Sequence, residues 1–115
     1  MTTPELSDAD YRQLAHATLS AIEKQLDTWL DQDVIDVDTH RSGGLLELAF
    51  PNGSKIILNT QPPLKELWLA ARGGGFHFRR QQGRWIDTRD GQTLAACLSH
   101  HASLQAGLTL RFDID

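Results

Sequence analysis

The spacing of apolar residues changes from a helical period to a strand period near residue 30, and this change constrains the fold most. From Tyr11 to Trp29, apolar residues recur at three- and four-residue steps, the pattern of a helix with one buried face. Ser7 precedes this stretch as a suitable N-cap, so the sequence predicts a helix over about residues 8–30. Beyond residue 32 the apolar residues alternate with polar ones, which is typical of strands with one buried face.

Short alternating segments separated by turn residues predict the strands. In chain order they are expected over residues 33–38, 45–50, 55–60, 64–71, 76–80 and 84–87. In the first of them Ile35 and Val37 face the core, and residues 41–44 form the turn that follows. The pair Asn52–Gly53 favours a type I′ hairpin, because both residues tolerate positive φ angles.

A second helix and a short tail complete the chain. Thr93 is a suitable N-cap, Leu94 begins an apolar helical pattern, and Gly107 favours the left-handed conformation that ends helices. Residues 108–112 are expected to form a short strand. Because the strand connections are too short for crossovers, the sheet is antiparallel and both helices cover one face. The predicted fold class is α+β: a two-layer α/β sandwich with five to six strands.

Composition excludes several classes of protein. The 115 residues suit one domain spanning 1–115, and 40% hydrophobic with 23% charged residues excludes a disordered tail. No apolar run approaches the roughly 20 residues of a membrane span. The first five residues lack the basic and apolar parts of a signal peptide, and the single cysteine, Cys97, excludes an internal disulfide. We therefore expect a cytoplasmic protein without a membrane anchor.

No catalytic constellation is recognisable. The chain has no P-loop, and Gly73–Gly75 precedes a strand, so no helix N-terminus stands ready to hold phosphate. Cys97 lies on the apolar side of the second predicted helix, where a cysteine usually packs as a small hydrophobe. No serine lies in a nucleophile elbow. The sequence therefore predicts a protein that is not an enzyme.

Acidic residues concentrate near the N-terminus. Residues 1–40 carry nine Asp and Glu against two Lys and Arg, leaving −7, whereas residues 41–115 carry a net charge of +3. Six of these acids lie along the last two turns of the first helix, in the loop after it and on the first predicted strand. We predict them as ligands of a shallow all-oxygen site for hard cations. They are Glu23, Asp27, Asp31, Asp33, Asp36 and Asp38. A solvated acidic face is the equally weighted alternative.

Three polar or aromatic residues mark the uncovered face of the predicted sheet. Strand alternation places Asn59, Gln61 and Trp68 opposite the inward leucines. A tryptophan displayed among amides on an uncovered sheet is typical of a protein interface. The alternative is a tryptophan shielded by neighbours such as His77.

The five histidines lack a metal-binding spacing. His100 and His101 are adjacent and point about 100° apart on a helix, so they do not easily share one metal. Solvated or capping roles are the favoured interpretation. Whether His16, His40 or His77 contributes to metal binding stays open.

With these residues identified, the chain resembles the frataxin family, in particular its bacterial CyaY-type members. The resemblance centres on the segments 52–63 (NGSKIILNTQPP), 67–70 (LWLA) and 74–78 (GGFHF). Trp85, Asp87, Gly91 and the close of the second helix at 105–107 also fit. The matching residues extend over nearly the whole chain.

The resemblance implies a protein that binds ferrous or ferric iron weakly and helps control iron–sulfur cluster assembly. It implies docking on the cysteine desulfurase and on the iron–sulfur scaffold protein, with the six carboxylates matching an acidic ridge and Asn59, Gln61 and Trp68 matching an exposed sheet patch. A monomer is expected, with iron-dependent oligomers as a further state. Lys24, Thr28, Leu30 and Gln32 occupy positions where relatives commonly have acids, so this ridge carries fewer ligands.

Two functions from different classes follow. One is a metal-responsive regulator, in which iron on the acids changes docking to the desulfurase. The other is an interaction module without metal, whose acids meet a basic surface of that partner. A nucleic-acid interface built on Arg79, Arg80, Arg84 and Arg89 with Trp85 is disfavoured, because the net charge of −4 opposes phosphate binding.

Overall fold

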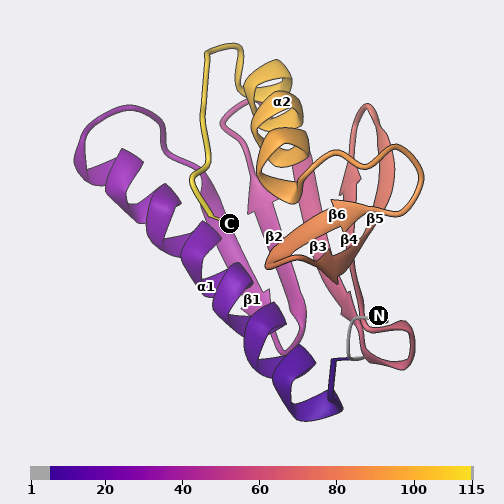
Figure 1. The fold of residues 1–115 in the computed structure, drawn as a ribbon. Helices are drawn as coiled ribbons and strands as arrows, with labels where there is room; N and C mark the ends of the chain where they lie inside the picture. Colours follow the sequence, from indigo (N-terminus) through magenta and orange to yellow (C-terminus); the bar gives the residue numbers. More distant parts are fainter. Residues whose placement is uncertain (1–5, 115) are drawn as a thin grey trace.

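The computed structural model describes residues 6–114, which form two α-helices and a six-stranded sheet (Figure 1). The elements are α1 (Asp8–Asp31), β1 (Asp38–Ser42), β2 (Leu45–Ala49), β3 (Lys55–Gln61), a 3-10 turn η1 (Pro62–Leu64), β4 (Glu66–Ala71), β5 (Gly74–Gln81), β6 (Arg84–Asp87) and α2 (Leu94–Ala106). Strand order follows chain order, all neighbours are antiparallel, and both helices lie on one face. The predicted α+β two-layer sandwich is confirmed. No helix within the described range is long and apolar enough to cross a membrane.

The core lies between the helices and the inner face of the sheet. Alternate strand residues point into it, and the register places Leu46, Leu58 and Leu69 side by side in full burial. A polar contact ties α1 to the far strand, where the indole N–H of Trp85 donates to the Thr18 hydroxyl at 2.8 Å. Neither α1 nor α2 covers the opposite face of the sheet, and we call it the open face.

The end of α1 sets the direction of the chain into the sheet. The amides of Asp33 and Val34 donate to the carbonyls of Leu30 and Trp29, at 3.1 and 2.8 Å respectively. This pair of bonds is a Schellman motif, in which the residue after the cap takes a left-handed conformation. Asp33 does so with φ of +57°, in a position that glycine usually occupies.

The predicted strand over residues 33–38 is wrong, and the helix cap is the reason. The cap uses the first residues of that segment to reverse the chain, so strand pairing begins only at Asp38, opposite Ala49. The expected burial nevertheless holds, because Ile35 is half-buried and Val37 is buried. The alternation of apolar and polar residues therefore predicted correctly which side chains contact the core, although this segment is not a strand.

Two turns also differ from their predictions. Residues 41–42 belong to β1 rather than to a turn. In the next hairpin the amide of Gly53 donates to the carbonyl of Phe50 at 2.9 Å, and Gly53 alone has a positive φ there. The central residues are therefore Pro51 and Asn52, which excludes type I′, since proline fixes a negative φ.

The C-terminal segment is not the strand expected over residues 108–112. Leu110 and Phe112 are buried as a strand pattern predicts, but their amides donate to the hydroxyls of Ser103 and Ser99 on α2, both at 2.9 Å. Side-chain oxygens of α2 thus accept the hydrogen bonds that a neighbouring strand would otherwise accept from these backbone amides. The tail thus runs beside α2 (yellow in Figure 1).

Candidate functional site

The predicted metal ligands follow the C-terminal half of α1 toward the edge of the sheet. We call residues 23–38 the acidic segment. In chain order its acids are Glu23, Asp27 and Asp31 on α1, Asp33 at the helix cap, Asp36 in the connection and Asp38 at the start of β1. All of them except Glu23 are exposed.

Glu23 differs from the other acids because Arg41 neutralises it. The guanidinium of Arg41 forms an ion pair with the Glu23 carboxylate. The same guanidinium lies 3.2 Å from the Ser20 hydroxyl and 3.0 Å from Nδ1 of His16. Arg41 therefore joins β1 to α1 and occupies the position that a cation beside Glu23 would take.

Strand alternation divides the acidic segment between two sides of the sheet edge. Val37 is buried and Arg41 reaches α1, so the odd-numbered residues here face the helices. Asp38 has the opposite parity and faces the open side. Within residues 6–114, no three His, Cys, Asp or Glu side chains form a group that could hold a metal. The acids therefore share one edge without forming a closed cage.

The five exposed aspartates are nonetheless a concentrated negative charge. None of their carboxylates takes part in a hydrogen bond or an ion pair with the described part of the chain. Like charges four residues apart on a helix repel one another, and the helix C-terminus adds partial negative charge. Such a concentration of negative charge attracts cations through long-range electrostatics.

The predicted partner-binding residues meet on the open face. Asn59 on β3 is the direct cross-strand partner of Trp68 on β4, and Gln61 is the partner of Glu66. Asn59, Gln61 and Trp68 are all half-buried. Trp68 lies on the side opposite the buried Leu67 and Leu69, as strand alternation predicted.

Trp68 also belongs to a connected cluster on the same face, which we call the open-face patch. Its members are Glu66, Trp68, His77 and Arg79. The Glu66 carboxylate accepts the indole N–H of Trp68 at 2.8 Å and Nε of Arg79 at 2.8 Å. The rings of Trp68 and His77 stack with centroids 4.1 Å apart and planes 7° apart. Glu66 is only 6% exposed, so these contacts hold a buried charge on an uncovered face.

Sequence reasoning missed Glu66 and Arg79 as members of this cluster, whereas it named His77 as a neighbour that could shield Trp68, and the two rings do stack. Alternation did place Glu66 on the same side as Trp68. A glutamate is rarely buried without a partner, and its partner depends on the register between β4 and β5, which pairs Glu66 with Arg79. Alternation predicts that His77 and Arg79 face the open side of the sheet. It does not predict which residue of β4 each of them pairs with.

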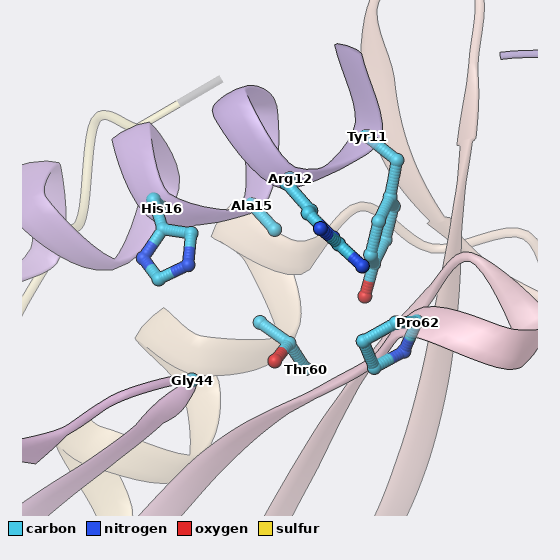
Figure 2. Close-up of a pocket in the computed structure, with 7 residues that line it drawn as sticks. All are labelled: Tyr11, Arg12, Ala15, His16, Gly44, Thr60 and Pro62. Atoms are coloured by element: carbon cyan, nitrogen blue, oxygen red, sulfur yellow. The ribbon is translucent and has the colours of Figure 1, made fainter. Parts of the chain in front are cut away.

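Tyr11 links α1 to the sheet where β3 and β4 meet. Its hydroxyl donates to the carbonyl of Glu66 at 2.5 Å and accepts the amide of Gln61 at 3.0 Å. Burial raises the pKa of this phenol, and the nearby charge of Glu66 adds to the effect while the Gln61 amide opposes it. Figure 2 shows the ring of Tyr11 descending from α1 beside Pro62, at the wall of a pocket of about 270 Å³.

The histidines left open by the sequence have separate environments. His16 contacts Arg41, and His77 stacks on Trp68. His40 is exposed on β1, opposite Glu47 in the register. None of them joins a metal-holding group in the described part of the chain.

Cys97 is buried in α2, as predicted. Burial, with smaller contributions from Asp87 and Asp90, raises the pKa of its thiol to about 12. A thiol with so high a pKa is a poor nucleophile near neutral pH. The structure thus gives Cys97 a packing role.

Comparisons with known proteins agree on one family. Residues 4–108 match the model of a frataxin-like domain. The iron–sulfur cluster assembly protein CyaY of Cupriavidus taiwanensis is 50% identical over 109 residues, which cover 95% of this chain and 98% of the relative. CyaY of Burkholderia pseudomallei is 49% identical over 107 residues, with coverage of 93% and 98%. The solved frataxin of Psychromonas ingrahamii is 34% identical with a TM-score of 0.81, covering 93% of this chain and 98% of that one.

Proposed function

The chain belongs to the frataxin family, and on that premise we propose that it acts in iron–sulfur cluster assembly as an iron-binding regulator rather than as an enzyme. In this proposal it contacts the cysteine desulfurase through the acidic segment and the scaffold protein through the open face. The name shared by its curated relatives supports the assembly role.

The observation that carries the iron-binding part is the set of exposed aspartates without protein partners. Asp27, Asp31, Asp33, Asp36 and Asp38 offer hard oxygen ligands that ferrous or ferric iron accepts. Glu23 is the sixth proposed ligand, but it must first leave its ion pair with Arg41. We therefore assign it a smaller share of the affinity. Binding is weak and leaves most of the metal's coordination to water.

The open face is the proposed docking surface for the scaffold. Asn59, Gln61 and Trp68 lie together there, on the face that neither α1 nor α2 covers. Half-buried aromatic side chains surrounded by polar groups are frequent centres of protein interfaces. The acidic segment, in contrast, suits a basic partner, because opposite charge accelerates encounter over distances beyond contact.

A second function is favoured by one specific observation. The acids do not converge into a metal-holding group within residues 6–114. An interaction module that uses the same acids only to meet the basic surface of the desulfurase requires no such convergence.

We propose a cytoplasmic monomer that forms oligomers only with iron and does not bind nucleic acid. Three of the four arginines considered for a nucleic-acid interface have partners within the chain: Arg79 pairs with Glu66, Arg80 lies 5.5 Å from the ring of Trp85, and Arg89 donates to the carbonyl of Gly75. Trp85 itself is fully buried, so no base stacks on it.

Desulfurase activity at a fixed, saturating amount of this protein separates the two functions when ferrous iron is varied. The regulator predicts an iron-dependent change in activity that the Asp27→Asn and Asp31→Asn variants lose, because asparagine keeps the shape and removes the charge. Lys24→Gln serves as a matched control on the same helix. Activity that is indifferent to iron would leave only the interaction module.

A further inference from the structure

Glu66 is a buried carboxylate on the face of the sheet that no helix covers. Its side chain is 7% exposed, whereas the side chain of Glu47 on the same face is 30% exposed. Removing a charge from water is costly unless hydrogen bonds and opposite charge replace its hydration. Neighbouring side chains on the open face must therefore provide both.

The open-face patch provides them at both carboxylate oxygens. Oε1 accepts the indole N–H of Trp68 and Oε2 accepts Nε of Arg79, each at 2.8 Å. Nδ1 of His77 lies 3.8 Å from Oε1, and its ring stacks on the indole. The register explains the arrangement, because Arg79 stands directly opposite Glu66 and His77 opposite Trp68. The four side chains thus form two adjacent cross-strand pairs on the open face.

The backbone of Glu66 is held by α1 as well as by the sheet. Its carbonyl accepts the Tyr11 hydroxyl from the helix side of the sheet. The Glu66 side chain therefore starts from a fixed backbone position and restrains Trp68 and Arg79 from there.

We propose that Glu66 is a positioning residue, which orders the indole of Trp68 and the guanidinium of Arg79 before a protein partner arrives. The inference rests on the proposed docking of the scaffold at the open face. A side chain that is ordered only on binding weakens an interface by up to about tenfold in affinity. Glu66 removes that loss for Trp68 and Arg79.

The same contacts specify the partner's chemistry. The indole N–H is already bonded to Glu66, so a partner contacts the carbon atoms of the ring. The Arg79 side chain is 54% exposed, and its terminal Nη groups make no hydrogen bond within the described residues. The surface therefore fits a scaffold segment that places an apolar side chain beside a carboxylate.

The first test uses the free protein, in which NMR observes the indole N–H of Trp68, assigned by its loss in Trp68→Phe. In Glu66→Leu this proton should exchange with water several-fold faster, because its acceptor is gone. Glu66→Gln keeps an acceptor for the indole but places an amide against Arg79, so the indole signal should change less. Glu47→Gln, with the same loss of charge on the same face, should leave the signal unchanged. An unchanged signal in Glu66→Leu would overturn the proposal.

The second test measures affinity for the cognate scaffold protein. Glu66→Leu should weaken binding about tenfold, Glu66→Gln by a few-fold through the released Arg79, and Glu47→Gln by less than twofold. If the leucine variant does not fold, the comparison of Glu66→Gln with Glu47→Gln decides. Wild-type affinity in the Glu66 variants, alongside weakened binding in Trp68→Ala, would refute positioning. Unchanged binding in Trp68→Ala would instead refute docking at the open face, and the indole signal would still test Glu66.

Discussion

The acidic segment and the open-face patch differ in how their carboxylates are exposed and paired. Asp27 and Asp31 stand in water without protein partners, whereas Glu66 is withdrawn from water and bonded at both oxygens. An exposed charge acts over distances near the screening length, about 10 Å at 0.1 M salt. A buried and bonded charge acts on the side chains that it touches. The first surface is therefore suited to attraction, and the second to recognition of shape.

This difference predicts unlike responses to mutation. In the acidic segment, charge should matter more than side-chain shape, because no described residue holds the carboxylates of its five exposed aspartates in a defined position. In the open-face patch, geometry should dominate, since a change at one residue releases its neighbours. Glu23 lies between the two cases, because Arg41 already holds it.

The largest expected effect is that of Trp68→Ala on scaffold binding. Truncating a central interface tryptophan typically costs about 2 kcal/mol or more, near 30-fold in affinity. Stability should fall by only about 1 kcal/mol, because the indole lies outside the core and water replaces its bond to Glu66. Calorimetric titration and denaturant unfolding measure the two quantities. A loss of stability of several kcal/mol without a change in affinity would assign Trp68 to the fold rather than to an interface.

Tyr11→Phe removes the hydroxyl beneath the open-face patch. It leaves the Glu66 carbonyl and the Gln61 amide without this partner, which should cost about 1–3 kcal/mol in the free energy of unfolding. The pKa of the phenol is raised above its ordinary value of 10.0 in the folded state. The contribution of the Tyr11 hydroxyl to the free energy of unfolding is therefore fully present below about pH 10 and is lost as pH rises through the folded-state pKa.

Tyr11 is the only tyrosine in the chain, so ultraviolet absorbance of tyrosinate reports its titration directly. The wild type should lose stability between neutral pH and strongly alkaline pH more steeply than Tyr11→Phe does. Equal slopes for the two proteins would show that folding does not raise the pKa of the Tyr11 phenol.

The sequence predicted the helices and the open face well, because periodicity and alternation are local patterns. The second helix shows this most clearly, since Thr93 and Gly107 cap α2 as expected. The start of β1 was not predictable in the same way: Asp33 adopts a conformation that favours glycine, and alternation alone does not distinguish a strand from an extended connection. The strand predicted for the C-terminal tail was wrong for a related reason. Hydroxyl groups of α2, rather than a neighbouring strand, accept the hydrogen bonds of its backbone amides.

The candidate sites were predictable only as sets of exposed residues. Strand parity was sufficient to place Trp68 and Asn59 on the same face of the sheet, but their direct pairing depends on the register. The burial of Glu66 depends on a cross-strand partner that only the register reveals. The roles of the six acids and of Asn59, Gln61 and Trp68 stay predictions.

Reversing two charges should affect association with the desulfurase. The double variant Asp27→Lys and Asp31→Lys changes the local charge by four units, so the association rate should fall roughly tenfold while dissociation changes little. Higher salt should weaken wild-type binding and narrow the difference between the two proteins. Stopped-flow kinetics at two salt concentrations measures this. Rates that do not depend on salt would remove the acidic segment from the encounter.

The smallest expected effect is a gain in stability. Asp33→Gly relieves a left-handed conformation and removes a negative charge at a helix C-terminus, which together should add about 0.5–1 kcal/mol. Asp33→Asn is the control, because it removes the charge while keeping a side chain in the same conformation. Both variants should bind iron more weakly. A glycine variant that is no more stable than the wild type would show that the Asp33 conformation carries no strain.

The division of labour between the two surfaces is tested most directly by amide NMR of the labelled protein. Ferrous iron is added first without oxygen, and then the scaffold protein is added to a fresh sample. Iron should broaden signals within residues 27–38 and spare the open face, whereas the scaffold should shift Asn59, Gln61, Trp68 and His77. Iron broadening centred on the open face, or scaffold shifts confined to the acidic segment, would contradict the assignment of the two surfaces.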